Sequence, residues 1–91
     1  MAGTRLVLTV ELERERRDRW IAEVVTIPGV MVYGKSRLDA FRKVQSLAFE
    51  VIADRVKHGE NPLTGRKLAR LGPPVRSVEF ERASQGALAG H

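Results

Sequence analysis

The chain contains no cysteine, two histidines and few aromatic residues. Without cysteine it can form no disulfide, no thiolate metal site and no cysteine nucleophile, and this composition fits a reducing compartment. No stretch approaches the roughly 18 consecutive apolar residues of a membrane span. The first residues also lack the uninterrupted apolar region of a signal peptide. We therefore expect a cytoplasmic protein with no membrane partner.

Residues suited to catalysis are equally scarce. His58 falls near the end of a predicted helix and His91 at the terminus, so no two histidines share a helix face as metal ligands would. The serines lack a nucleophile-elbow context, and the glycines form no phosphate-binding loop. Glu11 and Glu23 could face each other across two strands, which we interpret as solvated or salt-bridged charge and not as a metal site. We expect no enzymatic activity and no cofactor or metal.

The positive charge is confined to one region. The formal net charge is +5, and residues 55–76 hold six basic residues against Glu60 alone, which accounts for all of it. Any electrostatic partner should be sought in that segment. The candidate nucleic-acid contacts are Arg66, Lys67, Arg70 and Arg76.

Three extended segments precede a helix. Residues 5–13 alternate with the period of a half-buried strand, and Leu6, Leu8, Val10 and Leu12 share one face. The charged residues 14–18 form a hairpin connection to a second strand over 19–27. The segment Ile27-Pro28-Gly29-Val30 is a turn, because proline fixes φ and glycine accepts a positive φ. A short third strand over 30–33 follows.

A long amphipathic helix runs from the cap at Ser36 to about His58. The Ser36 hydroxyl can accept from the Asp39 amide and the Asp39 carboxylate can answer the Ser36 amide, while Gly59 can end the helix. The apolar arc is wider than one sheet needs, so a second neighbour or the segment after Gly59 should cover the excess. Arg55 in this arc should reach past the sheet edge or bond the final carbonyls. The arc comprises Leu38, Ala40, Phe41, Val44, Leu47, Ala48, Val51, Ile52 and Val56.

A fourth strand over 75–80 completes the pattern, with Val78 and Phe80 as core candidates and Pro74 favouring an edge position. We therefore predict an α+β fold: an antiparallel β-sheet with one long helix packed on one face, in the order β-β-β-α-β. Residues 1–80 form a single domain. Within it, residues 60–74 form an irregular basic connection with at most a short helix around 65–71. Residues 81–91 form a flexible C-terminal tail.

A second surface is expected on the sheet. If Trp20, Ala22 and Val24 face the core, then Ile21, Val25 and Ile27 lie on the opposite face with Val7, and that face is too apolar for simple solvation. The usual cover of such a face is a second copy, so we expect a homodimer or higher oligomer. The candidate oligomer or partner face is Val7, Ile21 and Val25.

Several local motifs follow one another in a fixed order over roughly residues 5–60. They are a Trp-x-Ala-Glu segment, a Pro-Gly-Val turn, a strand ending in glycine, a capped helix and a closing His-Gly-Glu. The residues that carry the pattern are Trp20, Ala22, Glu23, Pro28, Gly29, Val30, Gly34, Ser36, Ala40 and His58-Gly59-Glu60. In order and spacing, this pattern resembles the HicB family of antitoxins.

The resemblance implies a partial RNase H-like fold and the function of a type II toxin-antitoxin system. Such an antitoxin binds and neutralises a small HicA-like mRNA-cleaving toxin by occlusion. Family members commonly add a C-terminal DNA-binding module, but the residues after Gly59 are too few and too interrupted by proline for one. The alternative is a solitary oligomeric HicB-like protein that binds nucleic acid through the basic segment at 66–76.

Overall fold

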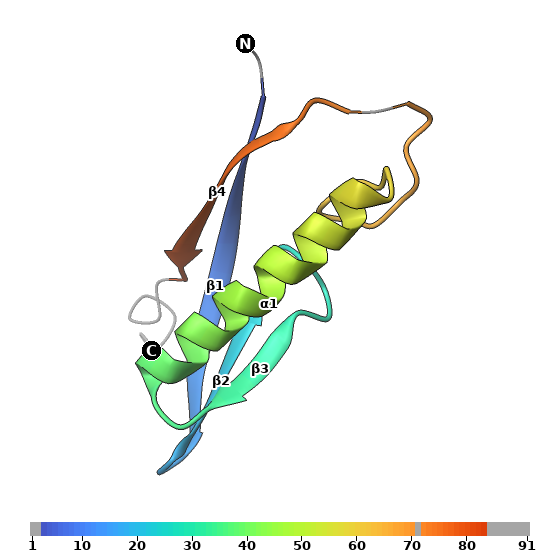
Figure 1. The fold of residues 1–91 in the computed structure, drawn as a ribbon. Helices are drawn as coiled ribbons and strands as arrows, with labels where there is room; N and C mark the ends of the chain where they lie inside the picture. Colours follow the sequence, from blue (N-terminus) through green and yellow to red (C-terminus); the bar gives the residue numbers. More distant parts are fainter. Residues whose placement is uncertain (1–2, 71, 84–91) are drawn as a thin grey trace.

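The computed structural model describes residues 3–70 and 72–83. Within them the predicted order of four strands and one helix is confirmed, and the fold is α+β (Figure 1). The elements are β1 (Thr4–Arg16), β2 (Arg19–Val24), β3 (Met31–Gly34), α1 (Arg37–Lys57) and β4 (Val75–Arg82). No helix in these two ranges combines the length and the apolar character needed to cross a membrane.

The four strands form one mixed sheet in the order β3-β2-β1-β4. β1 and β2 are antiparallel, as are β2 and β3, but β4 runs parallel to β1, so the prediction of a wholly antiparallel sheet is wrong. The connection after α1 brings the chain back to the start of β1, where the Thr4 amide donates to the Pro74 carbonyl at 2.8 Å. β4 therefore starts beside the start of β1 and must run the same way. Its predicted edge position is confirmed.

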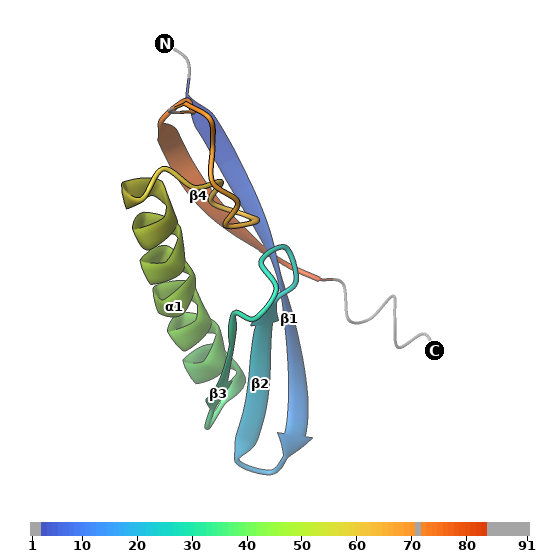
Figure 2. The same ribbon diagram turned by 90° about the vertical axis from the view of Figure 1, so that its right-hand side faces the viewer.

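The core lies between the sheet and α1, which covers one face of the sheet (Figure 2). The alternation predicted for the first strand is confirmed, because Leu6, Leu8, Val10 and Leu12 are at most 5 % exposed. Burial of each such side chain stabilises the fold by about 2 kcal/mol before entropy costs. α1 contributes a stripe of residues four apart, which pack as neighbours along one helix face. These are Ala40, Val44, Ala48 and Ile52.

β2 ends three residues earlier than predicted. The Ile27 amide donates to the Val24 carbonyl at 3.1 Å, and the Val30 amide donates to the Ile27 carbonyl at 3.2 Å, so two consecutive turns join β2 to β3. The first turn swings Ile27 into the core, where it is fully buried, and the prediction that it lies on the outer face is wrong. The second is the expected turn, with Gly29 at φ +92°.

Both ends of α1 are capped close to expectation. The Asp39 amide donates to the Ser36 hydroxyl at 3.0 Å, whereas the Asp39 carboxylate accepts from the Lys35 amide at 2.9 Å and not from Ser36 as predicted. Gly59 follows the helix with φ +71°. The carboxylate thus binds the amide one residue before the cap, which still fixes the entry of the chain into the helix.

The connection between α1 and β4 contains no helix in its described part. Arg55 holds it to the helix end, because its Nη1 donates to the carbonyls of Pro62 at 3.2 Å and Leu63 at 3.0 Å. The Arg55 side chain therefore bonds carbonyls of the following loop and not the helix's own last carbonyls. Farther on, residues 81 and 82 belong to β4, although we placed them in a flexible tail. The rest of that predicted tail, residues 84–91, lies outside the described residues.

Candidate functional site

The face of the sheet opposite α1 carries no other described element, and we call it the open face (Figure 2). Because side chains alternate along a strand, the residues between the buried ones of β1 point to this face. The strand pairing then arranges its side chains in rows. The rows are Tyr33–Ile21–Glu13, Met31–Glu23–Glu11, Val25–Thr9–Glu81, Val7–Glu79 and Arg5–Ser77.

Apolar side chains gather on the β2–β3 side of the open face. Ile21 lies opposite Tyr33, and Met31 lies one row farther along. Met31 is 48 % exposed and Tyr33 is 44 % exposed. The guanidinium of Arg19 lies over the Tyr33 ring at 4.0 Å and forms an ion pair with Glu15 at 3.0 Å. This side of the face thus offers an apolar surface that is bounded by a fixed cation–π pair.

Carboxylates lie mostly on the β1–β4 side, with Glu23 of β2 beside them. The five rows carry Glu11, Glu13, Glu23, Glu79 and Glu81 against Arg5, so their formal charge is −4 in a chain of +5, and the Arg19–Glu15 ion pair beside Tyr33 adds no net charge. The remaining residues therefore total +9. The sequence does not show this separation of charge directly, because the acidic residues of β1 alternate along the chain with basic and apolar residues.

Only part of this acidity is balanced locally. Arg5 binds Glu79 through two nitrogens, at 2.8 and 2.9 Å, and this pairing raises the pKa of Arg5 above its ordinary value. The Thr9 hydroxyl donates to Glu81 at 2.9 Å. Glu11 and Glu23 lie directly opposite each other, as anticipated, and the structure shows no ion pair for either within the described residues.

The predicted partner residues do not form one cluster. Val7 is 42 % exposed and lies beside Glu79, whereas Ile21 lies six β1 positions away, beside Glu13. Val25 is 41 % exposed and its amide donates to the Thr9 carbonyl at 2.9 Å, which places it between them. Sequence reasoning missed Met31 and Tyr33. Their alternation with Val32 in the third strand was a usable signal.

The basic residues of the connection are all exposed. Lys67 is held at the end of α1, where its Nζ donates to the His58 carbonyl at 2.7 Å. Arg66 and Arg70 lie in the loop on either side of it, and Arg76 lies in β4 near Gly3. None of the four forms an ion pair with a carboxylate in the described part of the chain.

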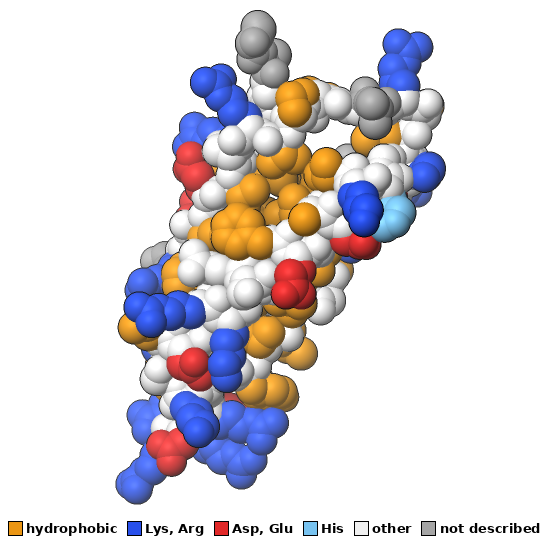
Figure 3. All heavy atoms as spheres, viewed as in Figure 1, with side chains coloured by type: hydrophobic (Ala, Val, Ile, Leu, Met, Phe, Trp, Pro, Cys, Tyr) orange, Lys and Arg blue, Asp and Glu red, His pale blue; other side chains and the backbone are white. Residues whose placement is uncertain are grey.

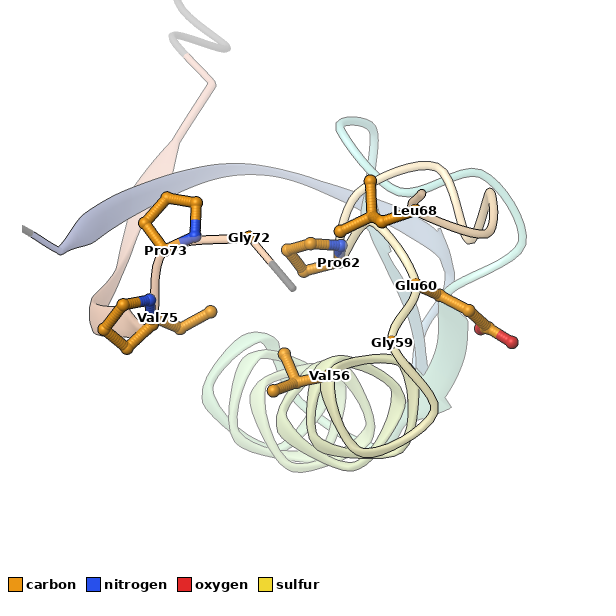
Figure 4. A pocket seen from close by; sticks show the side chains of 9 residues that line it. Val56, Gly59, Glu60, Pro62, Leu68, Gly72, Pro73 and Val75 are labelled. Carbon is orange, nitrogen blue, oxygen red and sulfur yellow. The ribbon is translucent and has the colours of Figure 1, made fainter. Parts of the chain in front are cut away.

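An apolar hollow of about 360 Å³ lies between the end of α1, the connection and the start of β4 (Figure 4). Val56, Pro62, Leu68 and Val75 surround it, while the Glu60 carboxylate points away. The hollow continues the gap between α1 and β4, where apolar side chains reach the surface (Figure 3). The polar groups at its wall are too few to orient a small ligand.

The described residues contain no group of three or more histidine, aspartate or glutamate side chains placed to share a metal ion. Comparisons of the chain with protein-family models, with curated proteins and with solved structures found no match. The arrangement offers two surfaces: an apolar area beside an acidic one, on a sheet face that no described element covers, and a separate basic segment.

Proposed function

We propose that this chain is a HicB-like antitoxin that binds a small HicA-like mRNA-cleaving toxin through the open face and blocks the toxin's active surface. The observation that carries the proposal is the open face itself, with exposed Met31 and Tyr33 beside a formal charge of −4. An enzyme that cleaves mRNA must attract phosphates, so its active surface carries positive charge. An acidic, partly apolar surface is complementary to it.

Occlusion requires no chemistry from the antitoxin. The carboxylates would steer the encounter with a basic partner and compete with RNA phosphates for its cations. The apolar residues Ile21, Met31 and Tyr33 would supply the desolvated centre of the interface. The resemblance to HicB antitoxins over residues 5–60 includes Trp20 and Glu23 of β2, one of the two central strands, which also carries Ile21 of this apolar area.

The test is co-expression in bacteria with a HicA-like toxin from the same host, with growth and mRNA lifetime as readouts. The unmodified chain should restore growth. A triple variant, Glu11→Gln with Glu13→Gln and Glu23→Gln, should weaken toxin binding about tenfold at low salt and less at high salt, because salt screens exposed charges. An unmodified chain that neither restores growth nor binds the toxin at micromolar concentration would show that the proposal is wrong.

The matched control carries three neutral substitutions on the exposed side of α1, Glu50→Gln with Asp54→Asn and Lys57→Gln. These residues lie on the other side of the molecule from the open face, so this variant should restore growth like the unmodified chain. Equal loss of binding in both triple variants would show an effect on stability and not on the open face.

A second candidate is nucleic-acid binding through Arg66, Lys67, Arg70 and Arg76. Their exposure without carboxylate partners in the described residues favours it. Affinity for duplex DNA or structured RNA should then fall steeply between two salt concentrations, and replacement of all four by alanine should abolish it. Micromolar or weaker binding that the alanine variant retains would exclude this function.

A further inference from the structure

Among the described residues, the β4 edge of the sheet is unpaired. β4 is hydrogen-bonded to β1 on one side, and along its other side no backbone hydrogen bond to any described residue is formed. β4 has eight residues, twice the length of β3 at the opposite edge. A row of free amides and carbonyls of this length is a template for pairing with another strand.

The direction of each amide in β4 follows from one contact. The Ala83 amide donates to the Val10 carbonyl of β1 at 2.8 Å. Because amides alternate in direction along a strand, those of Glu79 and Glu81 also point to β1. The amides of Val78 and Phe80 therefore point outward, at the centre of the unpaired edge.

The side chains next to this edge are apolar and incompletely covered. α1 packs on β1, β2 and β3 and diverges from β4, and apolar side chains line the gap (Figures 1 and 3). Phe49 of α1 is 49 % exposed, and its ring meets that of Phe80 edge-on at 5.4 Å. Phe41 meets the same ring at 6.4 Å. A strand added beside β4 would thus gain apolar contacts as well as backbone hydrogen bonds.

We propose that two copies of this chain pair through their β4 edges, antiparallel about a twofold axis, into one continuous sheet. β4 carries Arg76 and Arg82 against Glu79 and Glu81, so it is formally neutral. Stacking of two open faces would instead oppose two charges of −4, which is unfavourable. The β4 dimer leaves the open face free, and it does not depend on the antitoxin proposal.

Amide hydrogen exchange, measured on the purified protein, tests this pairing by comparing the outward amides of β4 with those that face β1. Between micromolar and millimolar concentration the chain should pass from monomer to dimer in sedimentation, and exchange of the Val78 and Phe80 amides should slow about tenfold or more. The amides of Glu79 and Glu81 are the internal control, because they are protected by β1 in both states. A chain that stays monomeric, or a dimer whose Val78 and Phe80 amides exchange as fast as in the monomer, overturns the proposal.

The absence of cysteine provides a second test, since one introduced cysteine reports one contact. Ser77→Cys, Glu79→Cys and Glu81→Cys place thiols along β4 without altering its buried side, and Glu23→Cys marks the centre of the open face. Under mild oxidation at least one β4 variant, alone or mixed with another, should form a disulfide dimer faster than Glu23→Cys. Faster cross-linking at Glu23→Cys than at every β4 position overturns the proposal in favour of stacked open faces.

Discussion

A Cβ atom added to Gly34 would lie 2.4 Å from the backbone nitrogen of Ala40 and 2.6 Å from its Cα. Gly34 ends β3, and Ala40 lies in the first turns of α1, fully buried. The backbones of strand and helix therefore touch at this point without room for a side chain. Glycine is required here for close approach and not for a positive φ, and this contact sets where α1 begins to cross the sheet.

Replacement of Gly34 by alanine should consequently lower the free energy of unfolding by about 3 kcal/mol, because the added methyl group meets rigid backbone. Denaturant unfolding measures this directly. Gly72→Ala is the matched control, since its Cβ would meet only the flexible Leu68 side chain, at 3.4 Å. That change should stay within about 0.5 kcal/mol. Equal stability of both variants would contradict the close approach.

Loss of the Ser36 helix cap should lower the free energy of unfolding by about 1 kcal/mol. Ser36→Ala removes the acceptor of the Asp39 amide, which no other helical carbonyl can replace at this position. Ser46→Ala, at an exposed position in the middle of α1, removes a hydroxyl without a capping role and should be neutral or slightly stabilising. Comparison of the thermal unfolding of the two variants distinguishes the loss of the helix cap from the loss of a serine hydroxyl elsewhere in the helix.

Asp39 should make stability depend on pH in the acid range. Its bond from the Lys35 amide, with a smaller contribution from Lys43 at 3.3 Å, lowers the pKa of this carboxyl below its ordinary value of 3.8. The unfolded chain then binds the proton more readily, so this contribution is complete above pH 3.8 and is lost as pH falls through the lowered value. Asp39→Asn should be less stable than the parent at neutral pH, and the difference should shrink in acid. Ser46→Ala, which removes no titratable group from α1, should show no such trend.

The strands and the helix could be predicted from the sequence where one face of the element is buried and the other is exposed. The alternation of Leu6, Leu8, Val10 and Leu12 fixed the orientation of β1, because a shift of one residue would expose the whole set. Ser36 and Gly59 marked the ends of α1 through local chemistry alone. Each of these features depends on residues close together in the chain.

The direction of β4 and the form of the open face could not be predicted, because both depend on distant contacts. The hydrogen bond from Thr4 to Pro74 joins residues 70 positions apart, and it brings the start of β4 beside the start of β1, along which β4 then runs parallel. The acidic side of the open face combines β1 with β4, and its apolar side adds β3 to β2. Ile27 was misplaced because an extra turn at Val24 breaks the alternation of β2.

Arg55 should stabilise the connection through its two carbonyl contacts. Arg55→Lys keeps the charge but cannot span both Pro62 and Leu63, so the amides of the connection should exchange faster while those of the core should not. The loss in local stability should be about 1.5 kcal/mol, as for hydrogen bonds to charged groups. Lys57→Arg, at an exposed position of the same helix turn, is the control and should leave exchange unchanged.

A substitution at Glu23, which lies opposite Glu11, should affect the stability of the fold and the binding of the toxin in opposite directions. Like charges directly across an antiparallel pair are destabilising, so Glu23→Lys should raise the free energy of unfolding by about 0.5–1 kcal/mol through a new pair with Glu11. Glu13→Lys is the control for stability, because Glu13 lies opposite Ile21 and gains no such pair. If the open face binds a basic toxin, the more stable Glu23→Lys protein should nevertheless restore growth less well in co-expression. A variant that is both more stable and equally protective would place the toxin contact elsewhere on the molecule, since folding could not then explain the result.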